Sequence, residues 1–201
     1  MTAPTVELRP LLPKDKDRLL AWRNSPGVAA FMYTDHEIGQ DEHARWFAAI
    51  EGDERRAFWI VELDGRPVGL ANFYDIDRLS RCASWAWYLA EDSARGRGVG
   101  RYVQYRMVEK AFADLGLRKL WCEALASNER ALHLYRSFGF KDEPSFRRHV
   151  LKNGEPVEVI GLGLLAEEWT EARPGVRRAL EGSGFLVGDE PEDRLGDPEG
   201  A

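Results

Sequence analysis

A loop rich in glycine and arginine, residues 95–100, constrains this chain more than any other feature of its sequence. It reads Arg95-Gly96-Arg97-Gly98-Val99-Gly100, follows a β-rich apolar run, and precedes a long stretch with the apolar spacing of a helix. The first amides of a helix have no partner within it, and glycines let a ligand approach the backbone closely. The helix dipole and the nearby arginines, with Arg101 next in sequence, add positive potential. The loop therefore predicts a pyrophosphate site that needs no metal.

Two common phosphate-binding motifs are excluded by their spacing. A Walker loop requires Lys and then Ser or Thr after its last glycine, whereas Arg101 follows Gly100 here. The dinucleotide fingerprint requires G-x-G-x-x-G after the first strand of a βαβ unit, and this loop has G-x-G-x-G after three β-rich runs. A glycine-rich surface turn without a ligand remains the alternative for the loop taken alone.

The rest of the chain predicts one mixed α+β domain around a central sheet. Apolar spacing and turn signals predict strands at 6–11, 58–63, 67–76, 82–90, 117–125, from 140, and at 157–165. Helices are predicted at 13–24, at 40–50, after Gly100 and after Asn128. Asp64-Gly65 and Asn153-Gly154 are strong hairpin signals. We expect residues 1–170 to form the domain and 171–201 to be an acidic, Gly/Pro-rich, mobile tail.

Charge and composition exclude several classes of protein. From Ala166 onward there are ten acidic and four basic residues, so the remainder is neutral and lacks the broad basic face of a nucleic-acid binder. No apolar run approaches the roughly 20 residues of a membrane span, and the N-terminus has no apolar signal core, which predicts a cytoplasmic protein without a membrane partner. The only two cysteines, Cys82 and Cys122, predict buried thiols and no metal site.

Two segments carry a family resemblance. Arg95-x-x-Gly98-x-Gly100 resembles the R/Q-x-x-G-x-G/A signature of the GNAT superfamily of acetyl-CoA-dependent N-acetyltransferases. Asn128, Ala131, Tyr135 and Gly139-Phe140 resemble the same family's N-x-x-A-x-x-x-Y-x-x-x-G-F segment. The resemblance implies a mostly antiparallel sheet with a splayed parallel strand pair and about four helices, and acetyl-CoA as acyl donor. The residues implied to bind it are Arg95, Gly96, Arg97, Gly98, Val99, Gly100, Arg101, Asn128, and Tyr88 or Leu89 through a backbone amide that holds the oxyanion.

A narrower resemblance involves four stretches outside the acetyl-CoA motif: Trp22–Ser25, Met32–His36, Asn72–Asp77 and Leu120–Glu123. They are similar to a GNAT branch that acetylates the 4-amino group of a UDP-linked dideoxy-amino sugar on the way to pseudaminic acid. The resemblance implies a small-molecule acceptor, and many GNAT enzymes form homodimers. Acetylation of a protein N-terminus, acetylation of an aminoglycoside, and an acetyl-CoA-binding module without catalysis remain alternatives.

Three residues are candidates for proton transfer. Tyr135 can protonate the thiolate of coenzyme A, because a phenol and a thiol have similar pKa values, although a tyrosine here can simply pack the helix on the sheet. Glu123 is the predicted general base, since a carboxylate in an apolar strand is costly unless it is paired or faces a cleft. The alternative is a structural carboxylate. His36 can act as a base through water or contact the acceptor.

The acceptor site is predicted from residue types near these groups. Tyr33 and Trp46 can stack on a nucleobase or cover a sugar, and Arg23 can contact a phosphate. Met32, Asp35 and His36 lie in the same stretch, where a sugar hydroxyl or amine can be held. Several tryptophans must belong to the core instead.

Overall fold

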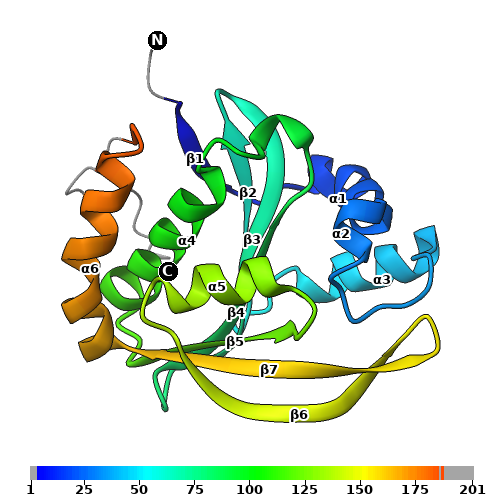
Figure 1. The fold of residues 1–201 in the computed structure, drawn as a ribbon. Coiled ribbons are helices and arrows are strands. Elements are labelled where there is room, and N and C mark those ends of the chain that lie inside the picture. The colour runs from blue at the N-terminus through cyan, green and yellow to red at the C-terminus, as the bar shows by residue number, and fades with distance from the viewer. Residues whose placement is uncertain (1–3, 186, 188–201) are drawn as a thin grey trace.

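The computed structural model describes residues 4–185 and 187, which form a seven-stranded sheet with helices on both faces (Figure 1). The order across the sheet is β1-β2-β3-β4-β5-β7-β6. The strands are β1 Val6–Pro10, β2 Ala57–Leu63, β3 Arg66–Asp77, β4 Cys82–Leu89, β5 Lys119–Leu125, β6 Lys141–Lys152 and β7 Glu155–Leu165.

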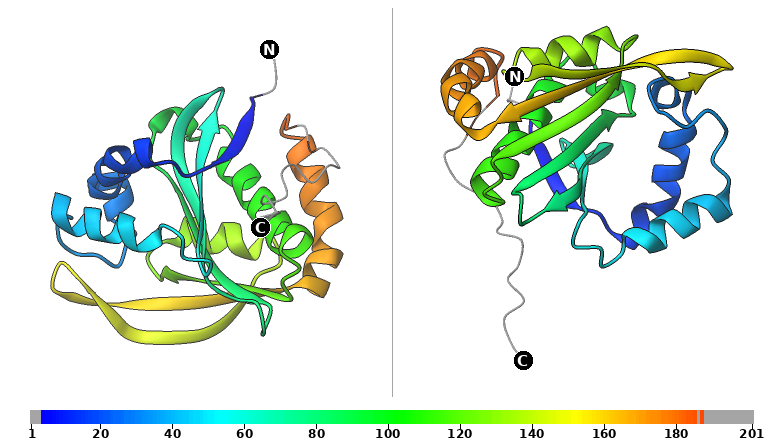
Figure 2. Two further views of the ribbon diagram at one scale, coloured as in Figure 1. Left: turned by 180° about the vertical axis from the view of Figure 1, so that it is seen from behind. Right: turned by 90° about the horizontal axis from the view of Figure 1, so that it is seen from below.

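The helices divide between the two faces of the sheet, as the view from below in Figure 2 makes clear. On one side lie α1 Lys16–Asn24, α2 Pro26–Ala29 and α3 Gln40–Ile50, and on the other α4 Val99–Glu109, α5 Glu129–Arg136 and α6 Ala166–Glu181. Short turns precede α1 and α4 (Pro13–Asp15 and Asp92–Ala94), and a π-helical turn, Lys110–Asp114, continues α4. No helix in the described residues has the length and apolar character to cross a membrane.

The predicted mixed α+β fold is confirmed, including the splayed parallel pair. β4 and β5 are the parallel neighbours, and they are in register only at Cys82–Lys119, Ala83–Leu120 and Ser84–Trp121. Both strands continue beyond this point, β4 bonded to β3 and β5 bonded to β7. Their facing edges therefore separate, and the sheet has an opening at its centre.

The apolar residues form one cluster on each face. The larger one packs α4, α5 and α6 on the sheet and contains Trp85, Cys122 and Tyr135. The smaller one joins α1 to β2 and β3 through Leu19, Trp22, Ile60 and Leu70, with Trp46, Phe58 and Tyr88 partly buried against it. Side chains alternate between faces along a strand, so neighbouring residues of β4 and β5 serve different clusters.

The folded part extends beyond the predicted boundary at residue 170. α6 continues to Glu181, and its buried Trp169, Val176 and Leu180 lie on one helical stripe, followed by buried Phe185. Pro174 and Gly175 suggest a helix end in the sequence, but a proline removes only one hydrogen bond, and packing of this stripe outweighs the loss. The rest of the expected mobile tail, residue 186 and residues 188–201, lies outside the described residues.

A buried carboxylate joins the first strand to the first helix. Asp15, whose side chain is fully buried, accepts two hydrogen bonds from the Arg9 guanidinium at 2.7 and 2.8 Å. It also accepts one from the amide of Leu12 at 3.1 Å, and Arg9 donates a further bond to Glu62 on β2 at 2.7 Å. The hydrogen bonds from Arg9 lower the pKa of Asp15. This cluster fixes α1 against β1 and β2.

We expect Asp15→Asn to lower the free energy of unfolding by about 2–4 kcal/mol at pH 7, because the fully buried end of the pair loses its charge and Arg9 keeps only Glu62 as a charged partner. The matched control is Asp142→Asn, which removes the half-exposed pair with Arg136 and should cost about 0–1 kcal/mol. Urea unfolding measures both changes.

The Asp15 contribution should also depend on pH. A carboxylate whose folded pKa is lowered contributes stability above its unfolded pKa of about 4, and loses that contribution as the pH falls through the folded value. The difference between wild type and Asp15→Asn should therefore shrink in acid. Equal costs for both variants, or a difference that grows in acid, would contradict this account.

Candidate active site

The loop before α4 has the backbone geometry of an anion site. Gly96 and Gly98 have φ values of 73° and 77°, in the left-handed region that favours glycine, and Gly98 is the N-cap of α4. Within the described part of the chain, the amides of residues 96–100 donate no hydrogen bond. They are therefore free to bind a ligand at the positive end of the helix dipole, as the sequence predicts.

Among the described residues, the ion pairs that Arg95 and Arg97 of this loop form are exposed. Arg95 contacts Asp92 at 2.7 Å, and Arg97 contacts Asp64 in the β2–β3 turn at 3.2 Å. Exposed pairs of this kind contribute little to stability, so both guanidinium groups can exchange their partner for a phosphate. Asn128, in contrast, caps α5, where its side chain accepts from the amide of Ala131 at 3.3 Å.

Two of the loop glycines are also required by close packing. A Cβ on Gly98 would lie 2.8 Å from Cε2 of Phe185, and a Cβ on Gly100 would lie 2.7 Å from Cη2 of Trp87. Phe185 is 2% exposed and stacks on Tyr102 with ring centroids 5.0 Å apart. The space at Gly98 is thus filled by the protein itself. Sequence reasoning missed Phe185, because a short apolar patch in a polar, acidic segment carries no signal for the element that it contacts.

Tyr135 lies behind the opening between β4 and β5, on the face covered by α5. Its ring contacts Trp85 and Phe140 edge-on or tilted, with centroids 5.6 Å away in both cases. Burial raises its pKa well above 10, and the neighbouring Cys122 thiol adds to the shift. Burial likewise raises the pKa of Cys122. Tyr135 is therefore a protonated phenol at neutral pH.

Glu123 lies next to Cys122 on β5 and faces the opposite side. Its Oε2 accepts a hydrogen bond of 2.7 Å from the hydroxyl of Tyr33, which comes from the loop between α2 and α3. Burial and this bond raise the pKa of Tyr33, so the phenol keeps its proton. The two predicted catalytic groups, Glu123 and Tyr135, thus flank the same strand on different faces of the sheet.

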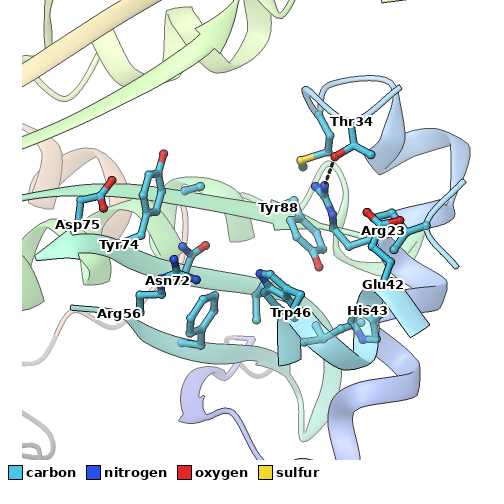
Figure 3. A pocket seen from close by; sticks show the side chains of 16 residues that line it. Arg23, Thr34, Glu42, His43, Trp46, Arg56, Asn72, Tyr74, Asp75 and Tyr88 are labelled. Atoms are coloured by element: carbon cyan, nitrogen blue, oxygen red, sulfur yellow. Dashed lines mark hydrogen bonds between the residues drawn. The ribbon is translucent and has the colours of Figure 1, made fainter. Parts of the chain in front are cut away.

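A cavity of about 500 Å³ lies between α1, α3 and the sheet (Figure 3). Four predicted site residues line it, namely Arg23, Met32, Trp46 and Tyr88. The other polar residues of its lining are Thr34, Glu42, His43, Arg56, Asn72, Tyr74 and Asp75. Thr34, Asn72, Tyr74 and Asp75 belong to the stretches of the narrower resemblance, but sequence reasoning assigned them no individual role, and it missed Glu42 and Arg56. A signal existed for Asn72 and Tyr74, because they alternate with buried residues of β3 and so share one face.

A half-buried cation without a carboxylate partner, Arg23, lies at the α1 side of this cavity (Figure 3). The Arg23 guanidinium donates to Oγ1 of Thr34 at 3.2 Å, and no acidic side chain of the described residues forms an ion pair with it. Burial lowers its pKa, while the nearby Tyr88 acts in the opposite direction. The Tyr88 hydroxyl is itself buried and has no hydrogen-bond partner in the described structure. Both groups can bind an anion.

The remaining predicted acceptor residues lie outside the cavity lining. His36 is 63% exposed and lies 3.0 Å from Glu42. Asp35 accepts a hydrogen bond of 2.8 Å from the amide of Asn153 in the β6–β7 turn. His43, by comparison, is buried, stacks on Trp46 at 5.4 Å, and has Nε2 at 2.7 Å from the Lys16 carbonyl oxygen. No group of three or more possible metal-ligating acidic, His or Cys side chains occurs in the described residues.

Comparison with known proteins gives a consistent picture of the fold. Residues 5–141 match the family model of the acetyltransferase (GNAT) domain. Spermidine N(1)-acetyltransferase of Escherichia coli (strain K12) is 25% identical over 154 residues, 77% of this chain and 82% of that protein. Acetyltransferase PseH of Campylobacter jejuni is 27% identical over 122 residues, 61% of this chain and 74% of that protein. A solved structure of Vibrio cholerae spermidine N-acetyltransferase with CoA and spermine has a TM-score of 0.76 at 21% identity, covering 82% and 98% of the two chains.

The geometry of the loop before α4 predicts how a methyl group added at Gly98 changes the affinity for acetyl-CoA. Gly98→Ala should weaken binding of acetyl-CoA about tenfold or more, because the new Cβ displaces Phe185 and the left-handed backbone becomes strained by about 1–2 kcal/mol. Calorimetry with acetyl-CoA measures the affinity. Gly116→Ala is the control, since its φ is +60° but nothing lies within 4 Å of the added Cβ. Unchanged affinity in Gly98→Ala would place the donor site elsewhere.

Proposed function

Since this chain belongs to the acetyltransferase (GNAT) domain family, it is an acetyl-CoA-dependent N-acetyltransferase, and we propose that its acceptor is a small amine that also carries a negative charge. The acceptor that fits best is a UDP-linked dideoxy-amino sugar, acetylated on its 4-amino group. Donor and acceptor are bound together, and the amine attacks the acetyl group directly.

The half-buried Arg23 guanidinium, which forms no ion pair with an acidic side chain of the described residues, is the observation that carries this proposal. A charge taken out of water without a partner is costly, and a phosphate or carboxylate of the acceptor would offset that cost. Arg23 and the unpartnered hydroxyl of Tyr88 both line the cavity and can donate to the same anion. Trp46 lines it too and offers an aromatic face to a sugar or a base.

The donor side is supported by the loop and by the opening in the sheet. The free amides of residues 96–100, with Arg95, Arg97 and Arg101, suit the pyrophosphate of acetyl-CoA. Beyond Ser84 and Trp121, the edges of β4 and β5 that face each other carry backbone groups not used in pairing, including those near Tyr88 and Leu89. These groups can bind the rest of the donor and the developing oxyanion.

Proton transfer would take place on both faces of β5. On the cavity side, Glu123 accepts the amine proton, and Tyr33 holds its carboxylate in place at 2.7 Å. The neutral amine nitrogen bonds to the carbonyl carbon first, the tetrahedral intermediate gives this proton to Glu123, and the carbon–sulfur bond then breaks with the thiolate as leaving group. On the other side, Tyr135 gives its proton to the leaving thiolate. Burial raises the pKa of Tyr135 and of the neighbouring Cys122 thiol. The same burial would raise the pKa of the leaving thiol of coenzyme A, so that the phenol and this thiol keep similar pKa values.

A polyamine acceptor is the second candidate. The E. coli relative and the V. cholerae neighbour are spermidine acetyltransferases, and Glu42 and Asp75 line the cavity. Both carboxylates lie in exposed pairs that a polyamine could replace, Glu42 at 3.0 Å from His36 and Asp75 at 3.3 Å from Arg55. Arg23 lines the same cavity and would repel a polycation, and this favours an anionic acceptor.

A screen of amines separates these acceptors. The chain is incubated with acetyl-CoA and, in turn, a UDP-linked 4-amino sugar, spermidine, a ribosomal-protein N-terminal peptide and an aminoglycoside, and free thiol is followed. We expect the highest kcat/KM for the UDP-linked sugar. Arg23→Met should lower this value about ten- to a hundredfold, since charge-assisted hydrogen bonds are lost. The control is Arg45→Met, an exposed arginine on α3.

The same variant tests the alternative. If spermidine is the preferred acceptor, Arg23→Met should leave its turnover unchanged or raise it, because a repulsive charge is removed. That result, or a preference for the peptide, would contradict an anionic small-molecule acceptor.

A further inference from the structure

The side chain of Lys152 links the far end of β6 to the loop between α2 and α3. Its ammonium donates to three backbone carbonyl oxygens, those of Ala29 at 2.8 Å, Met32 at 3.0 Å and Thr34 at 2.9 Å. Asp35 lies 3.8 Å away as a fourth neighbour, and the Lys152 side chain is only 14% exposed. A buried ammonium has three donors, and here each has a partner.

The loop that Lys152 contacts has few bonds of its own. We define the acceptor loop as residues 30–39, between α2 and α3. Within the part of the chain that the structure describes, the amides of residues 33–37 donate no hydrogen bond. Asn24 holds the far end by two bonds of 2.9 Å with the backbone of Ile38. The middle of the acceptor loop is therefore held by side chains from distant parts of the sequence.

The same loop supplies four residues to the proposed acceptor site, one of which, Ile38, lines the cavity at the far end of the loop. Tyr33 donates to Glu123, Thr34 accepts from Arg23, and Met32 and Thr34 line the cavity. The carbonyls held by Lys152 belong to Met32 and Thr34 themselves, on either side of Tyr33. Figures 1 and 2 show the β6–β7 hairpin reaching beneath this loop from the other end of the sheet.

We propose that Lys152 is a positioning residue for acceptor binding: its ammonium fixes the acceptor loop so that Tyr33 reaches Glu123 and Thr34 reaches Arg23. Lys152 does not line the cavity and touches no reacting atom. Its effect on the reaction rests on the proposed function, whereas its effect on the loop does not. The β6–β7 hairpin thus helps to determine which acceptors the site accepts.

Lysine suits this position because its three donors converge from one small ammonium. Arginine carries the same charge, but its planar fork cannot match three carbonyls that surround a single point. Methionine has similar length and no donor, and would leave three buried carbonyl oxygens without a partner. The acceptor loop should therefore open more often in Lys152→Met than in wild type. Lys152→Arg should hold the loop better than Lys152→Met but less well than wild type.

Hydrogen exchange of the acceptor loop tests the contact without any acceptor. Lys152→Met should speed exchange of the hydrogen-bonded amides of Met32 and Ile38, on either side of the unbonded residues 33–37, about tenfold or more, because the loop opens more often once the charged hydrogen bonds are lost. The matched control is Lys141→Met on the same strand, whose exposed ion pair with Glu168 lies at the opposite end of β6. In Lys141→Met, hydrogen exchange in the acceptor loop should equal that of wild type. If Lys152→Met does not fold, Lys152→Gln, which keeps two donors, should give an intermediate rate.

Kinetics test the consequence for the acceptor. With the UDP-linked 4-amino sugar and with spermidine as probes, Lys152→Met should raise the acceptor KM about tenfold and leave the KM for acetyl-CoA unchanged. Tyr33→Phe should cost less in the Lys152→Met background than in wild type, because an unfixed loop no longer brings Tyr33 to Glu123.

Two results would overturn the proposal. One is acceptor-loop exchange in Lys152→Met that equals the exchange in wild type. The other is an equal rise of both KM values with additive effects of Lys152→Met and Tyr33→Phe. A failure of the proposed function is distinct from both, since it would appear as absent turnover with either amine while the change in exchange persists.

Discussion

β4 and β5 are paired over only three residues each, from Cys82 to Ser84 and from Lys119 to Trp121, and then separate. Each strand is bonded on its other side, β4 to β3 and β5 to β7, so the separation does not unravel the sheet. Between them lies an opening whose two edges carry backbone donors and acceptors that no cross-strand partner uses. In the function that we propose, the glycine loop, the cavity, Glu123 and Tyr135 act together around this opening.

The two sides of the opening are built in different ways. On the donor side, the loop of residues 95–101 is part of a continuous strand–loop–helix unit, and its geometry follows from local glycines and the start of α4. On the acceptor side, the loop between α2 and α3 is fixed by Arg23, Glu123 and Lys152, which come from α1, β5 and β6. A local unit can bind the same donor in many proteins, whereas long-range contacts can change the acceptor without disturbing it.

Much of the fold could be predicted because its elements carry local signals. The apolar stripe from Gln40 to Ile50 gives α3 its observed bounds, and Asp64-Gly65 and Asn153-Gly154 form the expected hairpin turns with positive φ. The backbone geometry of the loop of residues 95–100 was predictable for the same reason. α6 was not, because Pro174 and Gly175 conceal a buried stripe. Glu123 could be selected by residue type, but its bond to Tyr33 spans 90 positions, and the partners of Lys152 lie 118 or more positions away. No local pattern indicates such contacts.

The central claim is that donor and acceptor reach the opening between β4 and β5 from opposite faces of the sheet. A crystal structure of the chain with coenzyme A tests it most directly. The account predicts the pyrophosphate on the amides of residues 96–100 and the sulfur between β4 and β5, near Tyr135 and with Glu123 on the opposite face. The cavity lined by Arg23 and Trp46 should then remain open for the acceptor. Coenzyme A lying in that cavity, with the opening closed by side chains, would contradict the account.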